Sequence, residues 1–428
     1  MRLQRLRRRV FTKRPLTRAA VEFLNAANGL HPLTRNPYAS VLVFWFGWPT
    51  SEVPGLYATA SALDAVRRGR RGDFAGTKGK AALALTAASW AILGVISYRG
   101  ATTAGPVLEA GLTEQLGPDY AAELKALPTQ PTRSGRRNPP LRTTLRTTTS
   151  RRRFVDKQNI VSYGPHGRAN LADIWRRRDL PRDGKAPVLL QVPGGAWVIG
   201  WRRPQAYPLM GHLVSRGWVC VSMNYRVSPL HTWPDHIVDV KRALAWVKEN
   251  IAAYGGDPNF VAISGGSAGG HLCALAALTP NDPKFQPGFE EADTSVVAAV
   301  PFYGRYDWYS TQDPGRAQFV EVLARLVVKQ KFSTHRQIYL DASPLRYVRA
   351  DAPPFFVLHG TDDSLIPVIE AREFVEELRS VSKSPVAYAE LPYTQHGFDI
   401  FGSPRADKAA DAVARFLSWV YVTNPPTP

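Results

Sequence analysis

The chain has 428 residues, a formal net charge of +19 and two cysteines. This length allows one large α/β domain with an extension, and so few cysteines exclude a small disulfide-stabilised scaffold. Both Cys220 and Cys273 lie in apolar sequence, where we expect buried thiols. The positive charge is concentrated near the N-terminus, because residues 1–153 carry 25 Lys and Arg against 8 Asp and Glu.

The first segment is rich in arginine. Arg8-Arg9-Val-Phe11 is similar to a twin-arginine export signal, but Pro15, Arg18 and Glu22 interrupt the apolar core that such a signal needs. We therefore predict no cleaved signal peptide.

Two apolar segments follow. Ala81–Tyr98 has no charged residue and is about long enough to cross a bilayer. Ser40–Trp48 is shorter and aromatic, and Pro49 and Pro54 after it favour an interfacial or re-entrant segment. Apolar sequence beside clustered arginines suits an anionic membrane surface rather than nucleic acid.

We therefore expect residues 1–127 to be a helical extension, associated with a membrane at the cell envelope through a single span or an interfacial anchor. The alternative is a set of Ala-rich helices that pack against the rest of the protein. Residues 128–153 are rich in Pro, Thr and Arg and predict a solvated linker or a strap that binds lipid headgroups.

From Phe154 onward, short apolar runs alternate with helical stretches. This texture indicates an α/β catalytic domain over residues 154–428 with a mostly parallel sheet, and we expect it to be soluble and active alone. The predicted strands are Val188–Val192, Val219–Asn224, Phe260–Ser264, Val296–Phe302, Phe355–His359 and Val386–Leu391, and the predicted helices include Pro234–Tyr254, Ala268–Leu278 and Pro367–Arg379. Residues 303–345 are too long for a simple crossover and predict a cap region.

A serine stands at one predicted strand-to-helix junction. In Gly265-x-Ser267-x-Gly269 the glycines leave room for a sharp, strained turn that exposes the serine hydroxyl at the tip of the sheet. The start of the following helix favours developing negative charge. Ser267 is therefore the candidate nucleophile.

A nucleophilic serine needs a base and an acid that orients it. Asp362 and Asp363 compete for the acid role, since both follow the predicted strand Phe355–His359. His396 follows the last predicted strand and is the candidate base. His359 lies within the acid motif, and His236 and His271 lie in predicted helices as packing or surface residues. For the oxyanion, the N–H groups of Gly194, Gly195 and Ala268 are the candidate donors.

These motifs together resemble one family. Pro193-Gly-Gly-Ala-Trp197, Asn224-Tyr-Arg226, the Ser267 turn, His359-Gly-Thr-Asp-Asp363 and His396-Gly-Phe398 are similar to the hormone-sensitive-lipase-like branch of the α/β-hydrolases, a group of bacterial carboxylesterases and lipases. The resemblance implies an eight-stranded sheet, a Ser267–Asp363–His396 triad and ester hydrolysis without a cofactor or metal. It also assigns the acid role to Asp363 rather than Asp362.

One residue departs from the family pattern, because Pro193 stands where the family has a histidine that braces the oxyanion loop. We expect a carboxylesterase or lipase that acts on small-molecule or lipid esters. The alternatives are an amidase or deacetylase with the same triad, and a membrane-tethered binding protein on an inactive hydrolase fold. Trp197, Trp201, Trp233 and Tyr303 fit either a substrate pocket or the core.

Overall fold

The computed structural model describes residues 15–34, 37–125, 147 and 149–424. The Arg-rich start of the chain and residues 126–146, which make up most of the predicted linker, lie outside the described residues. Residues 149–154 are helical, and Arg151 Nε donates to the buried Asp173 carboxylate at 2.6 Å. A helix that contacts strand β2 (Leu171–Trp175) therefore begins a few residues before the predicted boundary.

An eight-stranded sheet forms the centre of the protein, with strand order β1-β2-β4-β3-β5-β6-β7-β8. Its strands are β1 (Ile160–Ser162), β2 (Leu171–Trp175), β3 (Ala186–Val192), β4 (Val219–Met223), β5 (Gly256–Gly266), β6 (Ala298–Phe302), β7 (Phe355–Gly360) and β8 (Val386–Leu391). The first two pair antiparallel, and β3 to β8 run parallel. The mostly parallel sheet and its six predicted strands are confirmed; β1 and β2 are short strands that the apolar pattern did not reveal.

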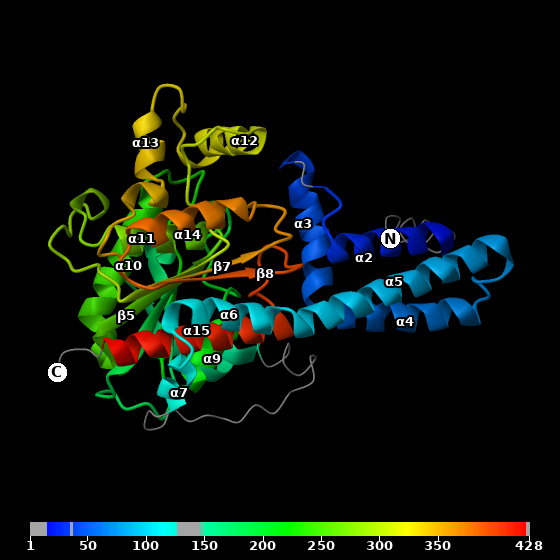
Figure 1. Cartoon of the computed structure of the whole chain (residues 1–428), viewed down its shortest axis with the longest axis horizontal. Helices are drawn as coiled ribbons and strands as arrows, with labels where there is room; N and C mark the ends of the chain where they lie inside the picture. Colours follow the sequence, from blue (N-terminus) through cyan, green and yellow to red (C-terminus); the bar gives the residue numbers. More distant parts are fainter. Residues whose placement is uncertain (1–14, 35–36, 126–146, 148, 425–428) are drawn as a thin grey trace.

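Helices cover both faces of the sheet (Figure 1). The helices after the linker are α9 (Tyr207–Ser215), α10 (Asp235–Asn250), α11 (Ala268–Leu278), α12 (Pro314–Val322), α13 (Arg336–Asp341), α14 (Ile369–Val381) and α15 (Pro404–Thr423). Short helical turns are η1 (Lys157–Asn159), η2 (Gly167–Asn170), η3 (Ile251–Tyr254), η4 (Pro283–Phe285), the π-turn η5 (Leu323–Val327) and η6 (Pro344–Tyr347). The segment predicted as a cap, residues 303–345, contains α12, η5 and α13 and ends within η6.

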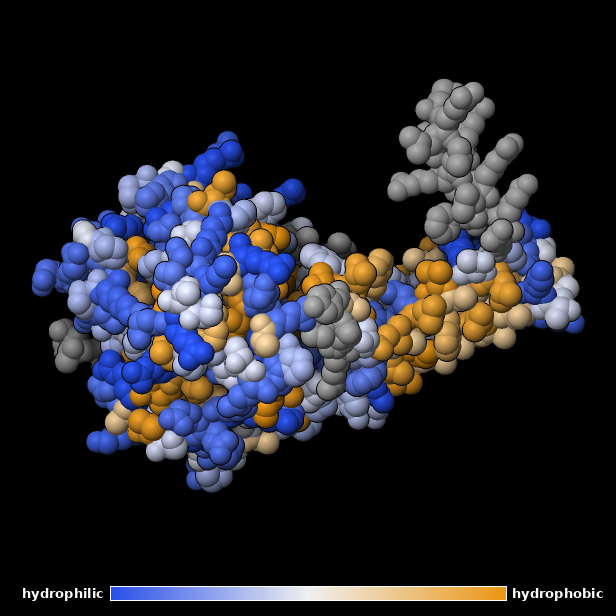
Figure 2. Space-filling view, turned by 90° about the horizontal axis from the view of Figure 1, so that it is seen from above, coloured by the Kyte–Doolittle hydropathy of each residue, from blue (hydrophilic) through white to orange (hydrophobic). Residues whose placement is uncertain are grey.

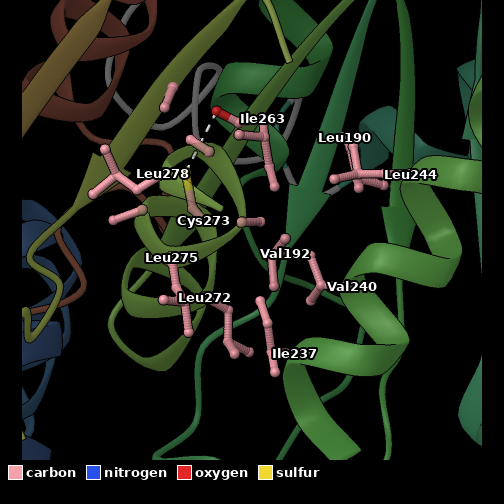
Figure 3. Packing of buried hydrophobic residues seen from close by; sticks show 14 of the residues in the cluster. Leu190, Val192, Ile237, Val240, Leu244, Ile263, Leu272, Cys273, Leu275 and Leu278 are labelled. Atoms are coloured by element: carbon pink, nitrogen blue, oxygen red, sulfur yellow. Dashed lines mark hydrogen bonds between the residues drawn. The ribbon is translucent and has the colours of Figure 1, made fainter. Parts of the chain in front are cut away.

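Strand β3 shows how the two cores divide. Successive side chains of a strand point to opposite faces, so Leu190 and Val192 join the core beneath α10 and α11, while Leu189 joins the core beneath α9 and α15. Figure 3 shows the first core, where apolar side chains of α10 and α11 meet those of β3 and β5. There the Cys273 thiol donates to the carbonyl of Ile263 at 3.5 Å. The expectation of two free, buried cysteines is confirmed.

The N-terminal region is helical, as α2 (Pro15–Leu30), α3 (Pro37–Glu52), α4 (Pro54–Arg70), α5 (Gly76–Thr102), α6 (Ala104–Leu116) and α7 (Tyr120–Lys125). Helices α2, α4 and α5 form an arm that projects from the sheet, and α3 stands beside the ends of β7 and β8 (Figure 1). Among the described residues, Gly76–Leu116 is the helical stretch long and apolar enough to cross a membrane. This stretch meets the criterion by its length and composition alone.

Helices α6 and α7 do not belong to a separate extension. Leu108, Leu112, Leu116 and Tyr120 are buried in the same core as β8 and α15. At Gly111 a side chain would place its Cβ 2.1 Å from the carbonyl oxygen of Tyr388, so α6 lies directly on strand β8. The expected boundary near Phe154 therefore cuts through a hydrophobic core.

We predict that a chain starting at Phe154 aggregates, contrary to the expectation from sequence. Each large apolar side chain of α6 and α7 contributes about 1.5–3 kcal/mol by burial, against a typical total stability of about 5–15 kcal/mol. A chain starting at Thr103 keeps both helices and serves as the control. Size-exclusion chromatography and thermal unfolding compare the two, and a soluble, cooperatively unfolding chain from Phe154 would contradict this prediction.

Candidate active site

Ser267 lies at the sharp turn between β5 and α11. Its φ of 58° is in the left-handed region, which side chains rarely adopt. A Cβ at Gly265 would lie 2.3 Å from the carbonyl oxygen of Gly269, and one at Gly269 would lie 2.2 Å from that of Val192. Both positions therefore require glycine, and the backbone that the sequence motif predicts is present.

Asp363 and His396 meet at the ends of β7 and β8. His396 Nδ1 lies 2.6 Å from Asp363 Oδ2, and both side chains are buried. The other carboxylate oxygen accepts the N–H groups of Leu365 and Ile366, each at 2.8 Å. These bonds hold the Asp363 carboxylate on its own turn. Because Asp363 contacts Nδ1 of His396, the other ring nitrogen, Nε2, is the one that could accept a proton from a hydroxyl group.

Burial raises the pKa of Asp363, but the imidazoles of His396 and His359 outweigh it and hold this pKa well below its ordinary value. Nε2 of His359 lies 3.3 Å from Asp363 Oδ2 and 2.9 Å from the carbonyl oxygen of Ile366. Because His359 is fully buried, it supports the acid turn and cannot reach a substrate.

Asp362 has a different partner. Its Oδ2 lies 3.2 Å from Nδ1 of His31, which follows helix α2. The geometry brings Asp363, and not Asp362, into contact with the candidate base.

The turns that carry the acid and the base are joined by Gln395, which sequence reasoning missed. Its Oε1 accepts the N–H of Ser364 at 2.8 Å and that of His396 at 2.9 Å. The only sequence signal for this role is that Gln395 adjoins His396.

Gly194 lies against the nucleophile, since a Cβ there would be 3.2 Å from Cβ of Ser267. Its N–H donates to Oε1 of Gln205 at 2.7 Å, and Nε2 of Gln205 donates back to its carbonyl at 3.0 Å. Gly194 can therefore bind an oxyanion only after Gln205 releases it. Ala268 is the first residue of α11, so its N–H has no acceptor within the helix. Gly195, with φ of 129°, lies on the same loop.

Tyr303 and Asp399 flank the base. The ring centroid of Tyr303 lies 4.5 Å from that of His396, and its hydroxyl donates to the Asp399 carboxylate. Burial raises the pKa of Asp399 to about 6 although Tyr303 and His396 oppose the shift. Aromatic Tyr303 was a sequence candidate, whereas Asp399 was not.

The other aromatic candidates divide between core and surface. Trp197 and Trp233 are buried and contact His271, whereas Trp201 is 68% exposed. Of the two placements expected for His271 and His236, packing or surface, both residues occupy buried packing positions, and burial lowers the pKa of each to about 3. Neutral imidazoles in these places serve packing and hydrogen bonding. Within the described residues no cluster of His, Cys, Asp and Glu could hold a metal ion.

We predict that Asp363→Asn lowers the rate of ester hydrolysis by roughly three or more orders of magnitude, because Asp363 contacts Nδ1 of the candidate base and would stabilise the positive charge that forms on its imidazole. Asp362→Asn is the matched control and should keep the rate within about threefold, since it removes a charge that faces His31. Initial rates on a water-soluble aryl ester measure both variants. The reverse ranking would show that Asp362 is the acid.

Known proteins resemble the chain over most of its length. Residues 173–378 match the family model described as BD-FAE. LipM, a probable carboxylic ester hydrolase of Mycobacterium tuberculosis, is 50% identical over 416 residues, which cover 95% of this chain and 93% of LipM. Esterase LipQ of the same organism is 44% identical over 375 residues, which cover 88% of this chain and 84% of LipQ.

Solved structures share the fold. A truncated carbohydrate esterase from gut microbiota superposes with a TM-score of 0.53 at 21% identity, over 62% of this chain and 97% of its own. Esterase 2 of Thermogutta terrifontis, phosphonylated by sarin, gives a TM-score of 0.53 at 24% identity, over 63% of this chain and 96% of its own.

Proposed function

Since this chain belongs to the α/β-hydrolase esterase family of LipM and LipQ, we propose that it hydrolyses carboxylic esters with Ser267 as nucleophile, His396 as base and Asp363 as acid. The observation that carries the proposal is the 2.6 Å contact between His396 and Asp363, at the edge of the sheet where Ser267 occupies its strained turn. The chain order and the positions of these residues support the roles of a serine hydrolase triad.

In the first half-reaction, Ser267 Oγ attacks the ester carbonyl carbon while Nε2 of His396 takes the hydroxyl proton. Asp363 holds the imidazole in the required tautomer and stabilises its positive charge. The imidazolium then gives the proton to the departing alkoxide, which leaves as the alcohol. Water repeats the sequence on the acyl-enzyme and releases the carboxylic acid.

The oxyanion that forms at each addition step needs N–H donors. Ala268 and Gly195 supply them in this proposal, and Gly194 joins them when Gln205 gives up its bond. Gln205 holds both polar backbone groups of Gly194, so it supplies the brace for this loop that the histidine replaced by Pro193 supplies elsewhere in the family.

Ser267→Ala should abolish ester hydrolysis, with a loss of at least roughly three orders of magnitude, while the melting temperature stays close to that of the wild type. A fluorophosphonate should label the wild-type serine and leave the variant unlabelled. Retention of most activity in Ser267→Ala would remove this residue from the role. Matched ester and amide substrates, assayed together, separate an esterase from an amidase or deacetylase.

The arm and helix α3 together suit a membrane surface. Most of the exposed large apolar side chains in the described residues lie on α2 to α5, and Figure 2 shows apolar residues gathered along the arm. Five exposed basic residues surround the turn between α4 and α5: Arg67, Arg70, Arg71, Lys78 and Lys80.

We propose that the arm and helix α3 lie in the membrane interface and do not span the membrane. Helix α6 is buried in the protein core. The turn between α4 and α5 carries positive charges, and the transfer of charges across a bilayer has a high free-energy cost. Apolar side chains such as Leu42 and Phe46, which are 63% and 65% exposed, would enter the acyl boundary while the basic tip binds anionic headgroups.

We predict that the full chain stays with membranes in high salt and is released by alkaline carbonate. The apolar face resists salt because salt screens only the charges. The double variant Leu42→Glu and Phe46→Glu should shift the protein toward the soluble fraction in high salt. Sedimentation followed by immunoblotting measures the distribution. Complete release of the wild type by salt would leave only the basic residues as the anchor, and retention in carbonate would indicate a span.

A further inference from the structure

We infer that helix α3 is a working part of the active site and that Trp48 is a positioning residue for the catalytic base. The inference rests on the proposed function, because it concerns how His396 is held for that reaction. It assigns a role in ester hydrolysis to a segment that precedes the sheet by more than a hundred residues.

The first observation is a bond to the base loop, residues 392–403, which joins β8 to α15. Nε1 of Trp48 donates to the carbonyl of Gly397 at 2.8 Å, on the residue that follows His396. Gly397 has φ of 72°, and a Cβ there would lie 3.2 Å from the same indole nitrogen. The backbone beside the base therefore has a conformation that favours glycine, and it fits closely against Trp48.

The second observation is an aromatic contact with the base itself. The ring of Phe44 meets the imidazole of His396 edge to face, with 5.7 Å between centroids, and stacks on Trp48 at 5.1 Å. Trp48 also packs on Phe401, with centroids 4.7 Å apart. Such aromatic contacts have preferred geometries, so they help to fix the orientation of the rings.

The third observation is a buried ion pair between Glu52, at the end of α3, and Arg405. Glu52 accepts from the Arg405 guanidinium and from Ser403 Oγ, the latter at 2.9 Å. Arg405 in turn donates to the carbonyl of Tyr393 at 3.3 Å. Buried ion pairs add little net stability, but the loss of one partner leaves a costly charge, so they specify position. Both ends of the base loop are thereby fixed to α3.

Helix α3 is itself held from behind by α2. Asn28 Nδ2 donates to the carbonyl of Val43 at 2.8 Å, and Asn25 Nδ2 donates to Oγ1 of Thr50 at 2.7 Å. Glycine at position 47 is required there, since a Cβ would lie 2.8 Å from the Asn28 amide. The arm and the base loop therefore form one connected structure.

This connection matters for the rate because a proton transfer depends on sub-ångström placement. A displacement of about 1 Å in a catalytic group can cost roughly 100-fold, whereas substrate binding depends on other surfaces. Loss of the Trp48 bond should therefore act on kcat and leave KM nearly unchanged.

The test compares Trp48→Phe with Trp45→Phe in the full-length protein. Trp48→Phe keeps an aromatic ring and removes the N–H donor. Trp45 lies on the same helix and is 55% exposed, so its replacement makes a matched control. Each preparation is titrated to completion with a fluorophosphonate, so that kcat is expressed per functional serine and unfolded protein does not count.

We expect Trp48→Phe to lower kcat about 10-fold to 100-fold with KM within about twofold, and to slow fluorophosphonate labelling by a similar factor. Trp45→Phe should stay within about twofold of the wild type in both. Equal kcat values for the two variants, or a Trp48→Phe effect confined to KM, would overturn the inference. Failure of the proposed function has a different signature, namely activity that survives in Ser267→Ala.

Discussion

The parallel alignment of β3 to β8 is the constraint on which the site depends. Parallel strands end at the same edge of a sheet, so turns that are far apart in sequence meet there. Strand β5 delivers Ser267 to this edge, β7 delivers Asp363 and β8 delivers His396. The proposed triad takes three side chains from three loops, and the hydrogen-bonded register of the strands fixes all three loops at once.

That alignment requires apolar burial on both faces of the sheet. One core lies under α10, α11 and α14, and the other lies under α6, α9 and α15. Helix α6 of the N-terminal region packs into the second core. Helix α3 lies beside the ends of β7 and β8, at the edge of the sheet where Asp363 and His396 meet (Figure 1). The N-terminal region thus contributes to both the stability of the sheet and the surroundings of the base.

Sequence reasoning found what depends on local pattern. Apolar runs identified the parallel strands, and the glycines around Ser267 identified a turn that no larger residue can make. The choice between Asp362 and Asp363 came from a family resemblance, and the geometry now supports it through the bond to His396.

Contacts between distant segments could not be predicted in this way. The inferred roles of Trp48 and Glu52 depend on the contact between α3 and the loop near His396. Neither the periodicity nor the spacing of the sequence predicts that contact. The same holds for α6, because nothing in its sequence shows that it packs on strand β8. A single sequence gives the composition of a helix but not the partner of its apolar face.

Trp48 and Gly397 are 349 positions apart, so the bond between them can form only after most of the chain has been synthesised. Helix α3 leaves the ribosome early, whereas its docking site is completed near the end of synthesis, roughly 20 to 70 s later at about 5–20 residues per second. During that interval the aromatic face of α3 has no protein partner and is open to chaperones or to a lipid surface. The nascent chain therefore exposes the aromatic face of α3 to chaperones and lipids before the loop that carries His396 has been synthesised.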